Sequence, residues 1–356
     1  MKEIYLDNAA ATRPDARVVR AMVRATHWYG NPSSFNDAGR AARAALDAAR
    51  DDVARFLYAR ASEIMFCASG SEANALALNG TAGILTQPTE HPSVLGRVDS
   101  SARFVRVDAA GRVDPAEVIA AIRADTRIVS VMYANNETGT VQPIKKLARL
   151  IREYRRTHQT AYPFLHVDAC QATAWLPMNV QDLGADLLTF NGLKVHGPAG
   201  TAVLYARRGV QHGIRAGTEN VPGAVGLAAA LNLIKKNDAQ RVGRLRRRLL
   251  ERLPIAVPGI RINGSTGDDS LPNIINISIP GMDSERLLLA LDRRGIRAGA
   301  GSACTAHQVE PSHVLVAMKV PRRYLGGVLR ISMSRFTTQS DVDAFLRELP
   351  KAILSC

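Results

Sequence analysis

Long hydrophobic runs are missing from this 356-residue chain. No stretch approaches the roughly 18 uninterrupted apolar residues that a membrane-spanning helix needs. The opening segment MKEIYLDNAA has no apolar run after its charged residues, as a secretory signal would have. The 46% hydrophobic and 22% charged residues are typical of a globular protein. We therefore expect a cytoplasmic globular protein without membrane association.

Cysteine is scarce as well. The four cysteines form neither CxxC pairs nor Cys/His clusters with zinc spacing, so no metal site is predicted. Cys67 and Cys170 lie on predicted strands or at their ends and are interpreted as packing residues, and Cys356 is terminal. Cys304 lies in the small-residue loop RAGAGSACTAHQVEPSHV at 297–314, where an accessible thiol can be reactive. The alternative is a spectator cysteine in a glycine-rich turn.

Lysine is rare although the chain is basic. Of the 46 Lys and Arg residues eight are lysines and 38 are arginines, and the net charge is +14. Such a charge suits an acidic protein partner or nucleic acid. The basic residues are spread from end to end, however, and the densest run, RVGRLRRRLLERL at 241–253, alternates with Leu as a solvated helix face does. The composition permits direct nucleic-acid binding, but the pattern does not predict it.

Short apolar runs alternate with amphipathic stretches, which predicts an α/β fold with a mainly parallel central sheet and helices on both faces. The expected helices cover 37–57, 71–79, 115–124, 144–157, 223–253 and 283–294, and the expected strands 63–68, 103–108, 127–134, 163–169, 185–190, 201–206 and 273–279. The chain is too long for one core. We predict a large domain at 1–253 and a smaller α+β domain at 254–356 that carries the Cys304 loop. The first dozen residues are expected to pack with the smaller domain.

Lys194 is the only lysine in an apolar neighbourhood, between ADLLTF and the GPAG turn that leads into TAVLYA. Burial lowers the pKa of a lysine and makes its amine nucleophilic, as Schiff-base chemistry with an aldehyde requires. The alternative is a structural lysine whose charged end reaches solvent.

Two further segments suit the same chemistry. Asp168 ends the strand-like run in FLHVDACQA, where a carboxylate can keep the ring nitrogen of pyridoxal phosphate (PLP) protonated, or can simply cap a helix. Ser69, Gly70 and Ser71 form a strand-to-helix junction whose N–H groups suit a phosphate monoester, although Ser and Gly are common caps everywhere. Together, the phosphate cup, the strand-end Asp and the later buried Lys favour a PLP site.

Eight segments carry a family resemblance over nearly the whole chain. They are YLDNAAATRPD at 5–15, YGNPSS at 29–34, TEHPSVL at 89–95, YANNETGTVQPI at 133–144, HVDACQA at 166–172, IRAGTENVPG at 214–223, GSACTAHQVEPSHVLVAM at 301–318 and LRISMSRFTT at 329–338. In this order they resemble the signatures of the PLP-dependent cysteine desulfurases of the NifS/IscS type, which are class V aminotransferases.

The resemblance implies a fold type I PLP homodimer that removes sulfur from L-cysteine, releases L-alanine and carries the sulfur as a persulfide on Cys304. The sulfur acceptor would be an Fe–S scaffold protein or an enzyme of tRNA or cofactor thiolation. The matching positions imply roles around the PLP ring: Lys194 binds PLP and transfers protons, Asp168 pairs with the ring nitrogen, Gln171 pairs with the ring hydroxyl, and His91 stacks on the ring. The phosphate would be held by Gly70, Ser71, Asn191 and Thr218 of the other subunit. Asn136 would contact the substrate or ring oxygen, and Arg330 would bind the substrate carboxylate.

The sequence departs from the family pattern beside the predicted lysine. Where the family reads Ser-Gly-His-Lys, this chain has Asn191-Gly192-Leu193-Lys194, so a hydroxyl becomes an amide and a proton-transferring histidine becomes leucine. A glycine-rich segment before IRAGTEN is shortened to VQHG at 210–213. Two alternatives to a working cysteine desulfurase stay open: a catalytically impaired PLP-binding sulfur-relay or scaffold protein, and a related selenocysteine or cysteine lyase.

Overall fold

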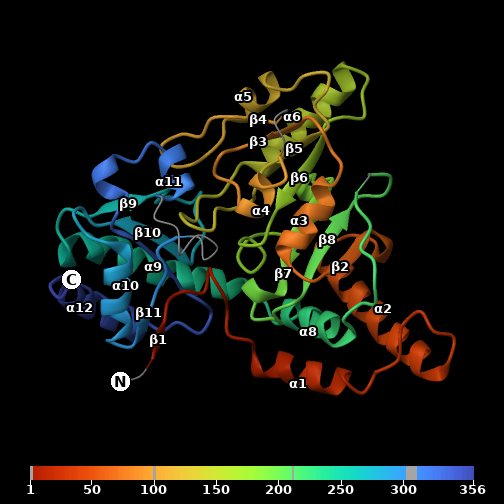
Figure 1. Cartoon of the computed structure of the whole chain (residues 1–356), viewed down its shortest axis with the longest axis horizontal. Coiled ribbons are helices and arrows are strands. Elements are labelled where there is room, and N and C mark those ends of the chain that lie inside the picture. The colour runs from red at the N-terminus through yellow and green to blue at the C-terminus, as the bar shows by residue number, and fades with distance from the viewer. Residues whose placement is uncertain (1–2, 99–101, 211, 302–310) are drawn as a thin grey trace.

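A seven-stranded sheet forms the centre of the larger part of the molecule (Figure 1), a computed structural model that describes residues 3–98, 102–210, 212–301 and 311–356. Its strands are β2 (Ile64–Cys67), β3 (Ile84–Thr86), β4 (Arg103–Phe104), β5 (Ile128–Ser130), β6 (Phe164–Asp168), β7 (Leu187–Asn191) and β8 (Ala202–Ala206), in the order β2-β8-β7-β6-β5-β3-β4. The pairs from β7 to β4 are parallel, and β8 is antiparallel to both of its neighbours. The carboxyl ends of β5, β6 and β7 therefore meet at one edge, where ligands bind in open α/β sheets.

Helices cover both faces of this sheet, as the α/β prediction requires. They are α1 (Ala16–Ala25), α2 (Asp37–Leu57), α3 (Gly70–Leu78), α4 (Pro92–Leu95), α5 (Pro115–Ala120), α6 (Ile144–Thr157), α7 (Val180–Leu183) and α8 (Val221–Leu231). Alternation along β8 separates the two faces: Val203 and Tyr205 join the core that contains α2, α6 and α8, whereas Leu204 joins the core around α3. The predicted fold class is thus confirmed.

A second, smaller unit surrounds an antiparallel sheet of β9 (Arg261–Asn263), β10 (Ile274–Ser278) and β12 (Val328–Ser332), in the order β12-β10-β9. Its helices are α9 (Lys236–Ala256), α10 (Ser284–Asp292), α11 (His313–Ala317) and α12 (Gln339–Ile353). The N-terminal strand β1 (Ile4–Tyr5) pairs in parallel with β11 (Ile296–Arg297), and Leu6 is buried in the same core. The start of the chain therefore lies with its C-terminal part.

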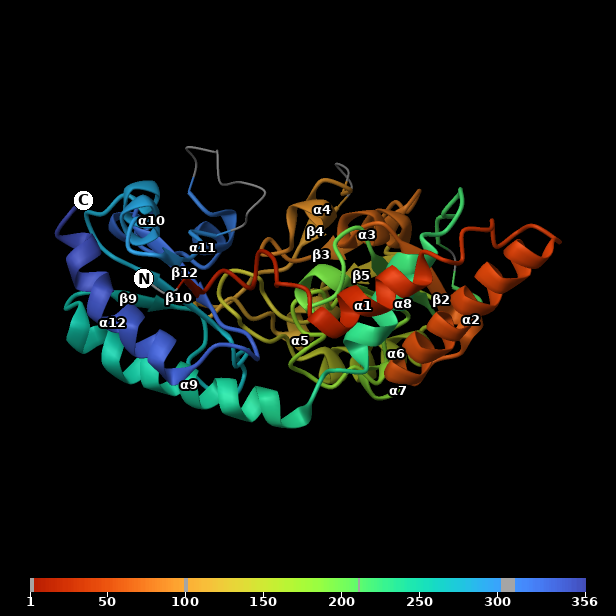
Figure 2. The ribbon, with the colours of Figure 1, turned by 90° about the horizontal axis from the view of Figure 1, so that it is seen from below.

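One helix differs from the sequence expectation. The pattern at 223–253 predicts a single helix, but the structure contains α8 and α9, separated at 232–235. Helix α8 is rich in Ala and packs between α1 and α2, whereas α9 buries Val242, Leu249 and Leu253 in the core of the smaller unit. Figure 2 shows α9 running along one side of the molecule below the smaller unit. Because the two helices serve different cores, we place the boundary between the units at 232–235 rather than near residue 253.

In the part of the chain that the structure describes, no helix combines the length and the apolar character of a transmembrane segment.

Candidate functional site

Asp168 is buried at the carboxyl end of β6. The side-chain amide of Asn74 donates a hydrogen bond to Asp168 Oδ2 at 2.7 Å, and the backbone N–H of Cys170 donates to Oδ1 at 3.0 Å. Asn74 lies on α3, is itself buried, and gives a second hydrogen bond to the Ser93 hydroxyl at 2.9 Å. Two N–H donors replace water around a buried carboxyl group. The end of β6 therefore presents a carboxyl group of fixed orientation.

Asn74 is not among the residues that the sequence motifs select, although one signal points to it. Asn74 follows Gly70 by four residues, and such a spacing places two positions on the same face of a helix. A phosphate cup at Gly70 therefore directs Asn74 toward the same site.

Lys194 ends the 3₁₀ turn η2 (Gly192–Lys194) directly after β7. Asn191 caps this turn, because its side-chain oxygen accepts from the backbone N–H of Lys194 at 3.2 Å. The Lys194 ammonium donates a hydrogen bond to the backbone carbonyl of Ala10. Lys194 and Asp168 both act electrostatically on His91. The structure thus brings these three predicted residues together at the carboxyl edge of the sheet.

Residues 9–12 run along this edge and contact it through their backbone. Gln171 Nε2 donates to the Ala9 carbonyl at 2.9 Å. The hydroxyl and the backbone N–H of Thr12 donate to the Leu193 carbonyl at 2.7 and 2.9 Å. These bonds fix the N-terminal segment against the turn that carries Lys194, and they hold the Gln171 side chain beside it.

Helix α3 begins at Gly70, close to the turn after β7. A Cβ atom on Gly70 would lie 2.9 Å from both Asn191 Nδ2 and Cys170 Sγ, so glycine is what permits this approach. Ser69 caps the helix, its hydroxyl oxygen accepting from the backbone N–H of Glu72 at 3.1 Å. The first N–H groups of α3 and the Asn191 amide therefore converge on one spot, which suits an anion. Ser71 lies exposed in the first turn of the same helix.

His91 caps α4, and its Nδ1 lies 2.8 Å from the Ser93 hydroxyl and 3.1 Å from the Ser93 backbone nitrogen, which donates to it. Burial lowers the pKa of His91; the negative charge of Asp168 opposes this shift, and the positive charge of Lys194 adds to it. His91 is therefore a neutral imidazole at pH 7, a form that can stack on an aromatic ring without the cost of burying a cation.

Cys67 and Cys170, which lie near this sheet edge, are poor nucleophiles. Burial raises the pKa of Cys67 to about 12, and it also raises the pKa of the Cys170 thiol, to which the charge of Asp168 adds. Both thiols thus stay protonated at neutral pH, as expected for packing residues.

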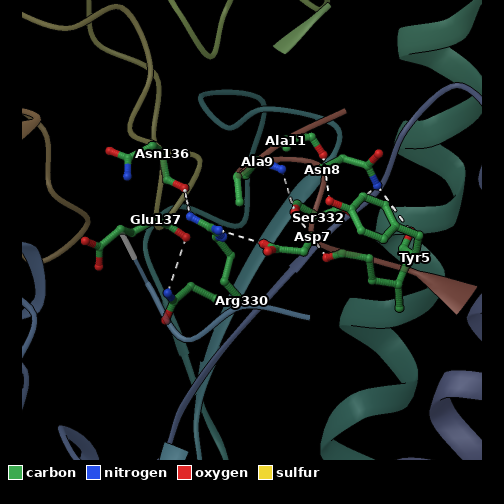
Figure 3. A network of polar contacts seen from close by, with 12 residues as sticks. Tyr5, Asp7, Asn8, Ala9, Ala11, Asn136, Glu137, Arg330 and Ser332 are labelled. Atoms are coloured by element: carbon green, nitrogen blue, oxygen red, sulfur yellow. Dashed lines mark hydrogen bonds and ion pairs between the residues drawn. The ribbon is translucent and has the colours of Figure 1, made fainter. Parts of the chain in front are cut away.

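Arg330 reaches the same region from the smaller unit, on β12, and is only 1% exposed. Figure 3 shows its guanidinium between the N-terminal segment and residues 136–137. One terminal nitrogen donates to Asp7 Oδ1 at 2.8 Å and the other to the Asn136 carbonyl at 3.0 Å. Its buried Nε has no hydrogen-bond partner among the described atoms. The guanidinium is thus held at two points and keeps donors for a further acceptor, such as a carboxylate.

Three predicted residues stand apart from this cluster. Asn136 contributes its backbone carbonyl to Arg330, while its side-chain amide extends away from the guanidinium (Figure 3). Thr218 is exposed and forms no hydrogen bond with the cluster in the described parts of this chain. Cys304 lies outside the described residues.

The chain resembles proteins of one family along its whole length. The model of the aminotransferase class-V family matches residues 4–214 and 208–345. A cysteine desulfurase of Trichormus azollae is 39% identical over 99% of this chain and 93% of its own length. The cysteine desulfurase IscS of Dictyoglomus turgidum is 35% identical over 99% of this chain and 95% of its own length. A solved NifS-like protein, 32% identical, superposes with a TM-score of 0.88 and covers 99% of this chain and 100% of its own.

Proposed function

The chain belongs to the class V aminotransferase family and is a PLP-dependent cysteine desulfurase of the NifS/IscS type, and on this premise we propose which of its residues carry out the reaction. The observation that carries the assignment is the meeting of Lys194, Asp168 and His91 at the carboxyl edge of the sheet, where the N-terminal segment contacts both Lys194 and, through Asp7, Arg330 of the smaller unit.

The residues at this edge fit PLP. The close approach of Gly70 to Asn191 leaves backbone N–H groups and an amide for a phosphate, and the buried Asp168 can face a cationic ring nitrogen. When bound, PLP supplies an aldehyde for the substrate amine and a ring that accepts electrons from the substrate.

The chain's own groups then have distinct tasks. Lys194 would bind the aldehyde and would move a proton with its amine. The Ala10 carbonyl accepts a hydrogen bond from the Lys194 ammonium and orients it. Asp168, oriented by Asn74, would keep the ring nitrogen protonated, and the neutral His91 would cover the ring face. Gln171 supports the ring hydroxyl, and the exposed Ser71 hydroxyl adds a donor for the phosphate.

Arg330 binds the carboxylate of L-cysteine through its unused donors, with Asn136 beside it. The Cys304 thiolate then attacks the substrate sulfur, the substrate C–S bond breaks, and the carbon takes a proton to give L-alanine. One sulfur atom moves onto Cys304, which becomes a persulfide, so the step needs no external oxidant. The persulfide passes its sulfur to an acceptor protein, an Fe–S scaffold or a tRNA- or cofactor-thiolation enzyme.

The protein works as a cytoplasmic homodimer. Large apolar side chains lie exposed on α1 and just after it: Val23 is 60%, Tyr29 is 87% and Phe35 is 95% exposed. A second copy would cover such a surface. Because Thr218 is exposed, its side chain is available to contact the phosphate site of the other subunit.

One alternative is favoured by a particular residue. The Leu193 side chain neither accepts nor donates protons, and its backbone is fixed by Thr12. A protein slowed at this step would bind PLP but relay sulfur only when another protein supplies it.

A single-turnover experiment separates the two functions. The PLP-loaded protein is mixed with L-cysteine, thiols are trapped, and peptides are analysed by mass spectrometry. A persulfide on Cys304 with one equivalent of alanine is expected. If borohydride fixes PLP on Lys194 but neither product forms, the relay alternative replaces the desulfurase. Leu193→His should then restore turnover if the missing histidine is the cause.

A further inference from the structure

Glu90 is completely buried in the turn between β3 and α4, one residue before His91. Its Oε1 accepts a hydrogen bond from the backbone N–H of Met132, just beyond β5, at 2.6 Å. Its Oε2 has no hydrogen-bond partner within the described residues. The backbone carbonyl of Glu90 accepts from His313 Nε2 of α11 at 2.9 Å. The turn that carries His91 is therefore tied to β5 by one carboxyl oxygen and to α11 by one carbonyl.

The surroundings of this carboxyl group disfavour a negative charge. The charge of Asp168 acts on it from β6, His91 follows Glu90 in the chain, and His313 of α11 contacts the backbone carbonyl of Glu90 rather than its carboxyl group. No ion pair involves Glu90 in the described parts of the chain. Burial raises the pKa of Glu90 to about 8, and the charge of Asp168 adds to this rise. The Met132 N–H, the Gln87 side chain and the His91 backbone oppose the rise without cancelling it.

Asp168 and Glu90 thus differ in a way that assigns them separate tasks. Asp168 accepts one N–H hydrogen bond on each of its two oxygens, whereas Glu90 accepts one on Oε1, from Met132, and its Oε2 has no partner within hydrogen-bond distance among the described residues. Of two nearby carboxyl groups, the one that is more deeply buried and accepts fewer hydrogen bonds is less able to carry a negative charge.

We propose that Glu90 is a positioning residue of the PLP site: as a neutral carboxylic acid it ties the His91 turn to the backbone after β5 without placing a second negative charge near Asp168. The inference rests on the proposed placement of PLP between His91 and Asp168. It concerns neither substrate nor sulfur, and it applies to the apo protein as well as to the holoenzyme.

The first test compares Glu90→Gln with Glu90→Ala. Glutamine keeps the oxygen that accepts from Met132 and is neutral, so PLP affinity and the pH midpoint of bound-PLP absorbance should stay within about twofold and about 0.3 pH units of the wild type. Alanine leaves the Met132 N–H unpaired and frees the turn, so PLP affinity should fall about tenfold or more. If Gln and Ala are equally impaired, or both behave as the wild type, the proposal is wrong.

The second test uses the apo protein. It requires that Glu90→Gln folds, and it does not depend on whether Glu90→Ala folds. A carboxyl group whose pKa is higher in the folded than in the unfolded state stabilises the fold at low pH, and this contribution declines up to about pH 8. Between pH 6.5 and 8 the melting temperature of the wild type should therefore fall relative to that of Glu90→Gln. Contributions from His91 and His166 are shared by both proteins and cancel.

Glu153→Gln makes the same chemical change on the exposed face of α6 and should follow the wild type at every pH. If the curves of the wild type and Glu90→Gln stay parallel, Glu90 is not neutral in the folded protein, and the proposal fails. Failure of PLP to bind Lys194 would overturn the proposed function instead, and would leave this apo measurement unaffected.

Discussion

The two halves of the candidate site are held by different kinds of contact. In the PLP half, Asp168 is fixed by neutral donors from Asn74 and the Cys170 backbone, all within the large unit. In the substrate half, Arg330 comes from the smaller unit and is held by the charged Asp7 and by the Asn136 carbonyl. The Asp168 carboxyl group is thus oriented within one core, although Lys194 and Gln171 of the same half also contact the N-terminal segment. The Arg330 guanidinium, by contrast, depends on how the two units and that segment meet.

The most severe disruption of the PLP half is Lys194→Ala. Because the amine both binds the aldehyde and moves protons, turnover should fall by at least about 10³-fold. Single-turnover formation of alanine measures this loss, and borohydride reduction followed by mass spectrometry should find no PLP adduct at residue 194. An unchanged melting temperature of the apo protein is the control. A reducible adduct on a different lysine with full turnover would contradict the assignment.

Arg330→Lys affects the substrate half alone. A lysine ammonium cannot reproduce the planar fork of the guanidinium, and a charge-assisted hydrogen bond contributes about 1.5–3 kcal/mol. We expect KM for L-cysteine to rise about 10- to 100-fold and PLP affinity to stay unchanged. Steady-state kinetics measure KM for L-cysteine, and a PLP titration measures PLP affinity. Equal losses of apparent affinity for L-cysteine and for PLP would show that the two halves of the site are not independent.

Asn74→Ala is the matched change in the PLP half. It removes one of the two donors to Asp168, so PLP should bind about tenfold more weakly, while KM for L-cysteine measured at saturating PLP stays the same. Asn79→Ala, at the exposed C-terminal end of the same helix, is the control and should bind PLP as the wild type does. A larger change in KM for L-cysteine than in PLP affinity would show that Asn74 belongs to the substrate half and not to the PLP half.

Asp7→Asn is expected to have the smallest effect. Asp7 is partly exposed, with 25% of its side chain accessible, and Arg330 keeps the Asn136 carbonyl. Loss of the ion pair should raise KM for L-cysteine about fivefold, on the order of 1 kcal/mol. The exposed Asp37→Asn serves as the comparison. An effect on PLP affinity without one on KM would remove Asp7 from the substrate half.

A contrast between local and long-range contacts explains which parts of the structure could be predicted from the sequence. Gly70, Asp168 and Lys194 each lie where a strand ends, and the chemistry of such junctions can be recognised from a few neighbouring residues. Helices α2 and α6 begin and end where their amphipathic pattern does. Asn36 caps α2 by accepting a hydrogen bond from the Gly39 backbone N–H at 2.8 Å.

The remaining parts depend on contacts between distant segments. The ion pair between Asp7 and Arg330 joins residues 323 positions apart, and no local sequence pattern predicts it. Glu90 reaches Met132 across 42 positions, again without a local signal. The break between α8 and α9 has the same origin, because only the division of the two cores decides where one helix must end and the next begin.

The N-terminal segment has a consequence for how the protein folds. Residue 4 pairs with residue 296, and Asp7 forms a β-bridge with Ser332, so this segment obtains these partners only after residues 296 and 332 have been synthesised. These contacts span most of the chain, and loop closure makes such long-range pairing slow. The Ala10 carbonyl that holds Lys194 and the carboxylate that holds Arg330 therefore reach their places together, as a late step of folding that completes both halves of the site at once.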